Sequence, residues 1–209
     1  MTVAQEVVFV VDDDPLVRET LERLLTDCGY QVCSFACAEK FLNLDPRPAS
    51  GCLVLDLDLP GLDGLELQQR LHTDQTPLPI VFLTGMGDIP TSVRAMKNGA
   101  TDFLTKPVSD GALRRAVRIA METSRKAYAE HLQLAELRER FAALTARETE
   151  VLRLAVDGLL NKQIAAQLGI TEKTVKVHRG NIKKKLGVQS LLELAHLTER
   201  AGIMTESRE

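Results

Sequence analysis

The sequence predicts an α/β doubly wound domain on a five-stranded parallel sheet, followed by a long helix and a second domain made only of helices. In the first half, five short apolar runs alternate with stretches of helical periodicity. In the second half, helical periodicity continues without a strand-like run. The net charge also changes sign, from −7 over residues 1–122 to +4 over residues 123–209. We therefore expect two domains, of which the basic one binds a polyanion.

The first half alternates strand and helix patterns. The strand-like runs are Val7–Val11, Val32–Phe35, Leu53–Leu55, Ile80–Leu83 and Phe103–Leu104. The helical patterns between them are Pro15–Cys28, Ala38–Leu44, Gly64–His72 and Ile89–Asn98. Asp14 and Pro15 suit the cap and the first position of the first helix, which ends at Gly29. Because each pair of successive parallel strands needs a crossover connection, the alternation predicts a parallel sheet with helices on both faces.

The second half is helical throughout. The pattern from Leu113 to Phe141 predicts one long helix, and two shorter helices that meet near Ser124–Glu130 are the alternative. Thr145 and Glu148 have the spacing of a capping box, which predicts a new helix there. Four helices are expected from Thr145 to about Arg200. We place the domain boundaries at 1–122 for the α/β domain, 123–142 for a helical linker and 143–205 for the helical domain.

Composition and pattern exclude several classes of protein. With 209 residues, 44% of them apolar, the chain has the balance of an ordinary globular protein. The clearest apolar runs, Val7–Val11 and Cys52–Leu55, are far shorter than the roughly 20 residues that cross a bilayer. The N-terminus has no basic region before its apolar run, so we expect no signal peptide and a cytoplasmic protein without a membrane partner. The four cysteines form no C-x-x-C pair and are expected to be free thiols.

Polar side chains stand at the carboxyl ends of the predicted strands, where doubly wound sheets bind their ligands. Asp12 and Asp13 follow the first strand, Asp56 follows the third, Thr84 ends the fourth, and Lys106 follows the fifth. Three carboxylates that lie close together repel one another, and a hard divalent cation with oxygen ligands keeps them ionised. We therefore expect Mg²⁺ here, and a phosphoryl group with one carboxylate as its acceptor.

Residues 1–122 resemble a response-regulator receiver domain, which is flavodoxin-like, and the whole chain resembles the FixJ-like two-component regulators. The resemblance implies that Asp56 is the phosphoacceptor, that Thr84 and Phe103 are switch residues, and that Lys106 pairs with the phosphoryl group. It also implies a cis Lys106–Pro107 bond and metal ligation by Asp12, Asp13, Asp56 and the backbone carbonyl of Asp58. The implied partner is a sensor histidine kinase, with homodimerisation on phosphorylation through the surface around Val93 to Phe103.

The side chain of Asp58 adds a negative charge beside the acceptor. Many FixJ-like proteins have a basic or apolar residue at this position. Two effects of Asp58 stay open on sequence alone: it slows phosphorylation, or it orients a hydrolytic water.

The basic half contains a predicted helix-turn-helix. Asn161–Leu186 carries a net charge of +6, and Gly169 separates two helical patterns. On a helical wheel, Val175, His178, Ile182 and Leu186 form an apolar face, opposite a face that holds Lys173, Lys176, Val177, Gly180 and Lys184. Such a lysine-rich face fits the major groove of DNA, whereas a solvated surface is the alternative reading.

The stretch from Leu144 to Val188 closely resembles the LuxR-type DNA-binding module. The resemblance implies that Lys176, Val177 and Gly180 face base edges, and that Lys162, Thr174 and Lys184 contact phosphates. The expected partners are double-stranded promoter DNA and RNA polymerase.

The sequence thus predicts a phosphorylation-dependent transcriptional regulator that is not an enzyme. A regulator whose DNA binding is independent of phosphorylation is the first alternative. A phosphatase of the haloacid-dehalogenase type is the second, because an apolar strand followed by D-x-D, as in CLVLDLD, also opens that active site. Repeated turnover of p-nitrophenyl phosphate would identify a phosphatase.

Overall fold

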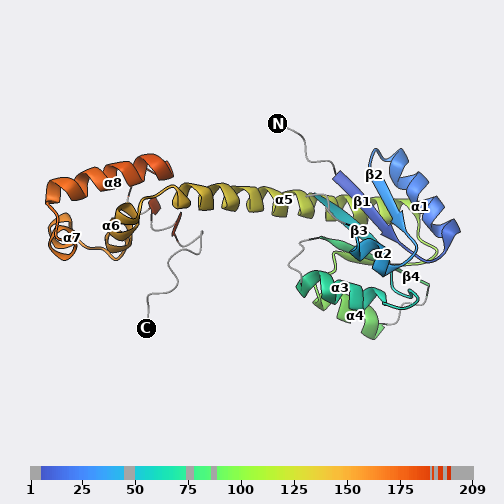
Figure 1. Cartoon of the computed structure of the whole chain (residues 1–209). Coiled ribbons are helices and arrows are strands. Elements are labelled where there is room, and N and C mark those ends of the chain that lie inside the picture. The colour runs from blue at the N-terminus through green and yellow to red at the C-terminus, as the bar shows by residue number, and fades with distance from the viewer. Residues whose placement is uncertain are drawn as a thin grey trace. The chain divides into compact units, whose positions relative to one another are not determined.

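The computed structural model of the chain (Figure 1) describes residues 6–44, 50–73, 78–85 and 89–188, with residues 190, 193, 194, 197 and 198. The chain forms two compact units, Met1–Ala129 and Glu130–Glu209. The strands are β1 Glu6–Val11, β2 Gln31–Phe35, β3 Ser50–Asp56, β4 Ile80–Thr84 and β5 Asp102–Thr105. The helices are α1 Pro15–Asp27, α2 Ala38–Leu42, α3 Gly64–Thr73, α4 Ile89–Lys97, α5 Asp110–Ala142, α6 Ala146–Val156, α7 Asn161–Leu168 and α8 Glu172–Leu186.

The five strands form one parallel sheet in the order β2-β1-β3-β4-β5, which confirms the predicted doubly wound fold. Successive side chains of a strand point to opposite faces of the sheet. Phe9, Leu53 and Phe82 therefore pack with helices α2, α3 and α4 on one face. Val10, Val54 and Leu83 pack with α1 and α5 on the other. Burial on both faces explains why the strands read as continuous apolar runs.

The end of β3 is positioned by a close contact with the start of α3. A Cβ atom on Gly64 would lie 2.5 Å from the carbonyl oxygen of Asp56 and 3.1 Å from the ring of Phe82. Only glycine leaves room for the helix to approach the strand this closely. The Gly64 N–H also donates to the Leu57 carbonyl at 3.0 Å. The sequence at position 64 thus helps to set the backbone of Asp56.

Helix α5 is continuous from Asp110 to Ala142, so the alternative of two shorter helices is wrong. Ser124, at the expected junction, is buried, and its hydroxyl accepts the Gly51 N–H at 2.9 Å. Arg125, the next residue, forms a salt bridge with Glu6. These two tertiary contacts hold the polar junction in the helix, which local sequence alone leaves ambiguous. The division between the two compact units falls within α5, after Ala129.

The second unit has a core of its own. Leu137 and Phe141 at the end of α5 pack with buried side chains of α6, α7 and α8. Thr145 caps α6 and forms the predicted capping box with Glu148. Gly169 ends α7 with φ of 66°, a conformation that suits glycine, and Thr171 caps α8. The predicted fourth helix and the boundary at residue 205 lie largely outside the described residues.

Candidate functional site

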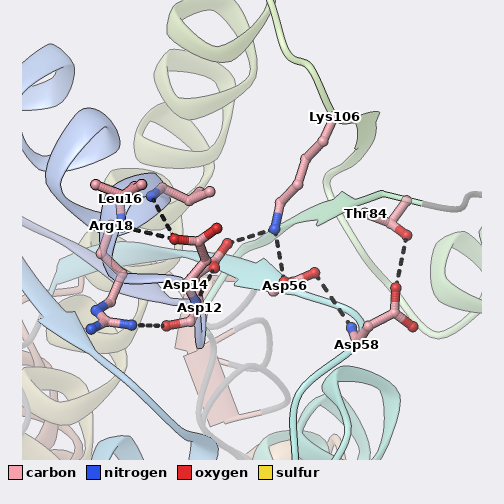
Figure 2. A network of polar contacts seen from close by, with 9 residues as sticks. Asp12, Asp14, Leu16, Arg18, Asp56, Asp58, Thr84 and Lys106 are labelled. Atoms are coloured by element: carbon pink, nitrogen blue, oxygen red, sulfur yellow. Dashed lines mark hydrogen bonds and ion pairs between the residues drawn. The ribbon is translucent and has the colours of Figure 1, made fainter.

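The predicted carboxylates meet at the carboxyl edge of the sheet (Figure 2). Asp12 follows β1, Asp56 ends β3, and one carboxylate oxygen from each of Asp12, Asp13 and Asp56 lies within 4.8 Å of the others. Asp12 and Asp56 are buried, whereas Asp13 is exposed. The neighbouring Asp14 has a different role. Its carboxylate caps α1 by accepting the Leu16 N–H at 2.8 Å. The cluster therefore has two buried oxygen donors and one open to solvent.

Lys106 bridges the two buried carboxylates. Its ammonium donates to Asp12 Oδ2 and to Asp56 Oδ2, each at 2.7 Å. Burial by itself lowers the pKa of Lys106, but its hydrogen bonds to Asp12 and Asp56 outweigh that effect and raise it. Burial raises the pKa of Asp12, and the bond from Lys106 only partly offsets this. The peptide bond that follows Lys106 is cis, as the resemblance implied.

The charge of this cluster matches a divalent cation. Three carboxylates and one ammonium leave two uncompensated negative charges, and the donor atoms are all oxygens of the kind that Mg²⁺ prefers. The residues present therefore fit the predicted metal. Arg18, which sequence reasoning did not select, adds a cation beside the cluster by donating to the Asp12 carbonyl at 2.6 Å. Its place on the first turn of α1, four residues after the capping aspartate, is the only sequence signal for it.

The two predicted switch residues lie on neighbouring strands. Thr84 ends β4 and is fully buried, and Phe103 lies on β5, half-buried, with its ring centroid 6.1 Å from that of Phe82. The Thr84 hydroxyl donates to Asp58 Oδ2 at 3.5 Å (Figure 2). The Asp58 N–H in turn donates to Asp56 Oδ1 at 3.4 Å. Asp58 thus connects Asp56, at the end of β3, to Thr84. Neither of the two sequence-based interpretations of Asp58 included this contact.

A cavity of about 610 Å³ opens beside the cluster. It is lined by Asp13, Leu57, Asp58, Leu59, Pro60, Asp63, Leu65 and Thr91. Three of these side chains are carboxylates on the loops after β1 and β3. The cavity borders the acidic cluster through Asp13.

In the helical unit, the predicted nucleic-acid interface is solvent-facing. Lys162 lies at the start of α7, and the other predicted contacts lie on α8. Six of the seven are exposed: Lys162, Lys173, Lys176, Val177, Gly180 and Lys184. Thr174 is half-buried, and its hydroxyl is hydrogen-bonded to that of Thr171 at 2.8 Å. The opposite face is in the core, with Val175, Ile182 and Leu186 buried and His178 half-buried, as the helical wheel predicts.

Two basic side chains of this region serve the fold of the unit. Arg179 donates to Asn161 Oδ1 at 2.7 Å and so ties α8 to the start of α7. Lys185 donates to Glu148 Oε2 at 2.7 Å and to the Ala143 carbonyl at 3.0 Å. The bond from Lys185, with that from the Thr145 N–H, lowers the pKa of Glu148 to about 2. The net +6 of the sequence therefore overstates the charge available to a ligand.

Comparison with known proteins assigns both units. Residues 8–118 match the response regulator receiver domain, and residues 142–198 match the bacterial regulatory proteins of the luxR family. Nodulation protein W of Bradyrhizobium diazoefficiens is 43% identical over 203 residues, which are 97% of this chain and 89% of that protein. The chain is a two-component response regulator. Transcriptional regulatory protein FixJ of the same organism is 39% identical over 199 residues, 95% of this chain and 97% of that one.

The response regulator also matches solved structures of the same class. The structure of the response regulator StyR aligns with a TM-score of 0.81 and 48% identity, over 94% of this chain and all of that one. The regulator therefore combines a receiver domain with a LuxR-type DNA-binding domain, and its function is phosphorylation-dependent control of transcription. Among the described residues, no helix has the length and apolar character that crossing a membrane requires.

Proposed function

We propose that Asp56 accepts a phosphoryl group from the phosphohistidine of a partner sensor kinase, and that this acylphosphate controls dimerisation and promoter binding. The observation that carries the proposal is the position of Lys106, which bridges Asp12 and Asp56 at the edge of the sheet. An ammonium at this place neutralises charge that a phosphoryl group brings to Asp56. Thr84 supplies a hydroxyl from the neighbouring strand, and the cavity beside Asp13 gives the kinase histidine access.

In this proposal Mg²⁺ binds to Asp12, Asp13 and Asp56, with the backbone carbonyl of Asp58 as a further ligand. When bound, the ion supplies positive charge that lowers the repulsion between the carboxylates and an incoming phosphoryl group. In the unphosphorylated site the hydrogen bonds of Lys106 to Asp12 and Asp56 raise its pKa. In this proposal the role of Lys106 is electrostatic, because its positive charge lies beside Asp56.

Phosphorylation by acetyl phosphate tests the assignment of Asp56. With Mg²⁺, the wild-type protein should gain the mass of one phosphoryl group, and removal of Mg²⁺ with a chelator should prevent the gain. Asp56→Asn should not be labelled. Asp14→Asn is the matched control, since asparagine caps a helix as well as aspartate and should leave labelling intact. Full labelling of the Asp56→Asn protein would place the acceptor elsewhere.

The phosphatase alternative makes a different kinetic prediction. A haloacid-dehalogenase-type enzyme should hydrolyse p-nitrophenyl phosphate over many turnovers, whereas a receiver should consume at most about one equivalent of a phosphodonor before its own acylphosphate decays. Incubation of the protein with p-nitrophenyl phosphate and Mg²⁺ therefore separates the two functions by the amount of product released.

The proposed dimer surface is helix α4 with β5. Ile89, Val93 and Met96 are large apolar side chains that are exposed by 79%, 44% and 45% and recur at helical spacing on α4. Thr84 and Phe103 lie beside this surface, so a phosphoryl group that repositions Thr84 can change it. Val93→Asp should leave labelling of Asp56 unchanged and prevent phosphorylation-dependent dimerisation in sedimentation experiments. Equal monomer populations of the phosphorylated and unphosphorylated wild type would contradict the proposal.

The proposed DNA contacts are Lys176, Val177 and Gly180 with base edges and Lys162, Thr174 and Lys184 with phosphates, and Lys173 belongs to the same DNA-facing surface. At the promoter the bound regulator acts on RNA polymerase. The proposal requires phosphorylation to raise promoter affinity. Promoter affinity of the wild type, measured with and without acetyl phosphate, tests this, with Asp56→Asn as the control. A promoter affinity that acetyl phosphate does not change would contradict the proposal.

A further inference from the structure

Helix α3 buries a polar side chain, Gln68, among apolar ones. Gln68 is 3% exposed and lies with Leu65 and Leu71 on the face of α3 that packs in the core. Its side-chain amide group donates to the Ala95 carbonyl at 3.1 Å and to the Asn98 carbonyl at 3.2 Å. Both carbonyls lie at the C-terminal end of α4, which packs on the same face of the sheet as α3 (Figure 1). Gln68 thus joins α3 to the end of α4.

The two acceptors fix the orientation of the Gln68 amide. A flipped amide would place its oxygen against two carbonyl oxygens, which have no proton to donate. In the observed orientation, Gln68 Oε1 is buried and has no hydrogen-bond partner. An unpaired buried acceptor is unfavourable, and the Ala95 carbonyl already accepts the Ala100 N–H at 3.1 Å. A leucine would avoid the unpaired oxygen, so stability by itself does not explain a glutamine at this position.

Helix α4 has little apolar packing to fix its position. Of its nine residues, all of which the structure describes, only Ala95 has a buried side chain. Ile89, Val93 and Met96, which form the proposed dimer surface, are exposed. Because an alanine buries little apolar area, it only weakly restricts the sliding or rotation of a helix. The position of the C-terminal end of α4 therefore depends on directional bonds such as those from Gln68.

We propose that Gln68 is a positioning residue that fixes the C-terminal end of α4 and so defines the surface through which the phosphorylated regulator dimerises. The inference rests on the proposed function, in which α4 and β5 form that surface. Buried polar groups with fixed partners can specify one packing arrangement where apolar contacts would allow several. Without the two bonds from Gln68, α4 occupies several positions, and association is weaker because the dimer must select one of them.

Hydrogen exchange of the unphosphorylated full chain, followed by mass spectrometry, tests the contact itself. Gln68→Met keeps the length of the side chain but has no donor. The amides of α4 and of the turn after it should therefore exchange about two- to tenfold faster than in the wild type, the range that one net hydrogen bond accounts for. Gln68→Glu, which replaces the donor by an acceptor, should accelerate exchange at least as much.

Two references separate this effect from a general loss of stability. Helix α1 packs on the opposite face of the sheet, so its exchange should stay at the wild-type rate. Gln69→Met is the matched control, because Gln69 is the exposed neighbour of Gln68 on α3 and should leave α4 unchanged. Unchanged exchange of α4 in Gln68→Met, or equal acceleration in α1 and α4, would overturn the proposal.

Sedimentation with Mg²⁺ and beryllofluoride, a stable analogue of the phosphoryl group, tests the consequence for dimerisation. The dimer of Gln68→Met should have a dissociation constant about two- to tenfold higher than that of the wild type. Labelling of Asp56 by acetyl phosphate, measured at concentrations where the protein is monomeric, should be equal in the two proteins. Gln69→Met should match the wild type in both measurements. A dimer of unchanged stability would overturn the proposal even if α4 exchanges faster.

Failure of the proposed function gives a different result. A wild-type protein that is not labelled, or that does not dimerise with beryllofluoride, would refute the proposed function and the role of Gln68 with it. A wild type that is labelled and dimerises, together with a Gln68→Met protein that behaves identically, would refute only the role of Gln68.

Discussion

Similar lysine residues have opposite roles in the two units. Lys106 lies between two buried carboxylates that belong to the candidate site, whereas Lys185 stabilises the fold through Glu148. Lys184, next to Lys185, is exposed on α8. The role of each lysine therefore depends on the carboxylates around its ammonium group: those of the candidate site for Lys106 and that of Glu148 for Lys185.

Removal of the Lys106 charge should strengthen Mg²⁺ binding. In Lys106→Met the carboxylates lose the ammonium that repels a bound Mg²⁺. Loss of the repulsion between these two charges should favour Mg²⁺ binding by roughly 1.4 kcal/mol or more, so the Mg²⁺ affinity should rise about tenfold or more. The same variant should be labelled by phosphodonor but should no longer dimerise in response. NMR titration with Mg²⁺ measures the affinity, with Lys97→Met on α4 as a control. Weaker Mg²⁺ binding by Lys106→Met would contradict a shared carboxylate cluster.

Glu148 should make the stability of the second unit depend on pH. Its pKa is lowered from an ordinary value of 4.5 to about 2, first by the Lys185 bond and then by the Thr145 N–H. A lowered carboxyl pKa contributes stability above the unfolded value of 4.5, and this contribution is lost as the pH falls towards 2. At pH 7, Glu148→Gln should lower the free energy of unfolding by about 1–2 kcal/mol.

Urea unfolding at several pH values tests this prediction. The difference between wild type and Glu148→Gln should be constant above about pH 5 and should shrink towards pH 2. Glu150→Gln is the control, since Glu150 is an exposed acid on the same helix that pairs with Arg147. Equal stability of wild type and Glu148→Gln at neutral pH would show that the charge of Glu148 beside Lys185 contributes nothing measurable.

At the scale of elements, helix α8 has one face that packs in the core and an opposite face that is proposed to bind DNA. Its buried face packs in the core, and its exposed face carries the lysines that we propose contact bases and phosphates. Lys176→Ala should cost about 1–3 kcal/mol at the specific site and relax the preference at one base position. Lys184→Ala should weaken specific and non-specific binding alike and reduce the salt dependence by about one unit of slope.

Titrations on specific and scrambled DNA at several salt concentrations distinguish the two lysines. Lys126→Ala on α5 is a control outside the predicted interface. Wild-type binding by both variants on every sequence would mean that the lysine face is a solvated surface.

Gly180 should show opposite effects on folding and on DNA binding. A Cβ atom at this position would meet nothing within 4 Å, so the fold does not require glycine there. Because glycine inside a helix costs about 1 kcal/mol relative to alanine, Gly180→Ala should stabilise the second unit by up to that amount. If DNA approaches the helix backbone at Gly180, the same change should weaken specific binding. Thermal unfolding and DNA titration of one variant measure both, and unchanged DNA affinity would remove Gly180 from the interface.

At the scale of the whole molecule, charge is divided between the two functions. The acidic receiver suits a cation and a phosphoryl group, and the basic unit suits a polyanion, so a single net charge of −3 hides two separate sites. In the proposed function, one small DNA-binding unit offers few contacts, and two copies bind together with high affinity. The proposed dimerisation on phosphorylation supplies the second copy.

The phosphorylated protein should therefore prefer paired half-sites about one helical turn apart. Insertion of about five base pairs between the half-sites rotates them to opposite faces of the DNA and should reduce binding to that of a single site. Footprinting with the phosphorylated wild type checks this, with Val93→Asp as a variant that should not distinguish the two spacings. Equal affinity for both spacings would contradict binding as a dimer.

The order of elements, the edge of the sheet that carries the site and the two faces of α8 follow from sequence. These features depend on local periodicity, on capping residues such as Asp14 and Thr145, and on the general rule that parallel strands end at one edge. The family resemblance added the roles of Asp56, Thr84 and Lys106. Side chains at strand ends were predictable because backbone geometry alone brings them together.

Only the tertiary structure decided which of these side chains make contact. Lys106 meets Asp12 and Asp56 across sequence separations of 94 and 50 residues, and Thr84 donates to Asp58, an acceptor that no pattern indicates. The burial of Ser124 against Gly51 kept α5 continuous where its own sequence is polar. Periodicity gives the face on which a residue lies, but a hydrogen bond depends on which distant group the packed core brings to that face.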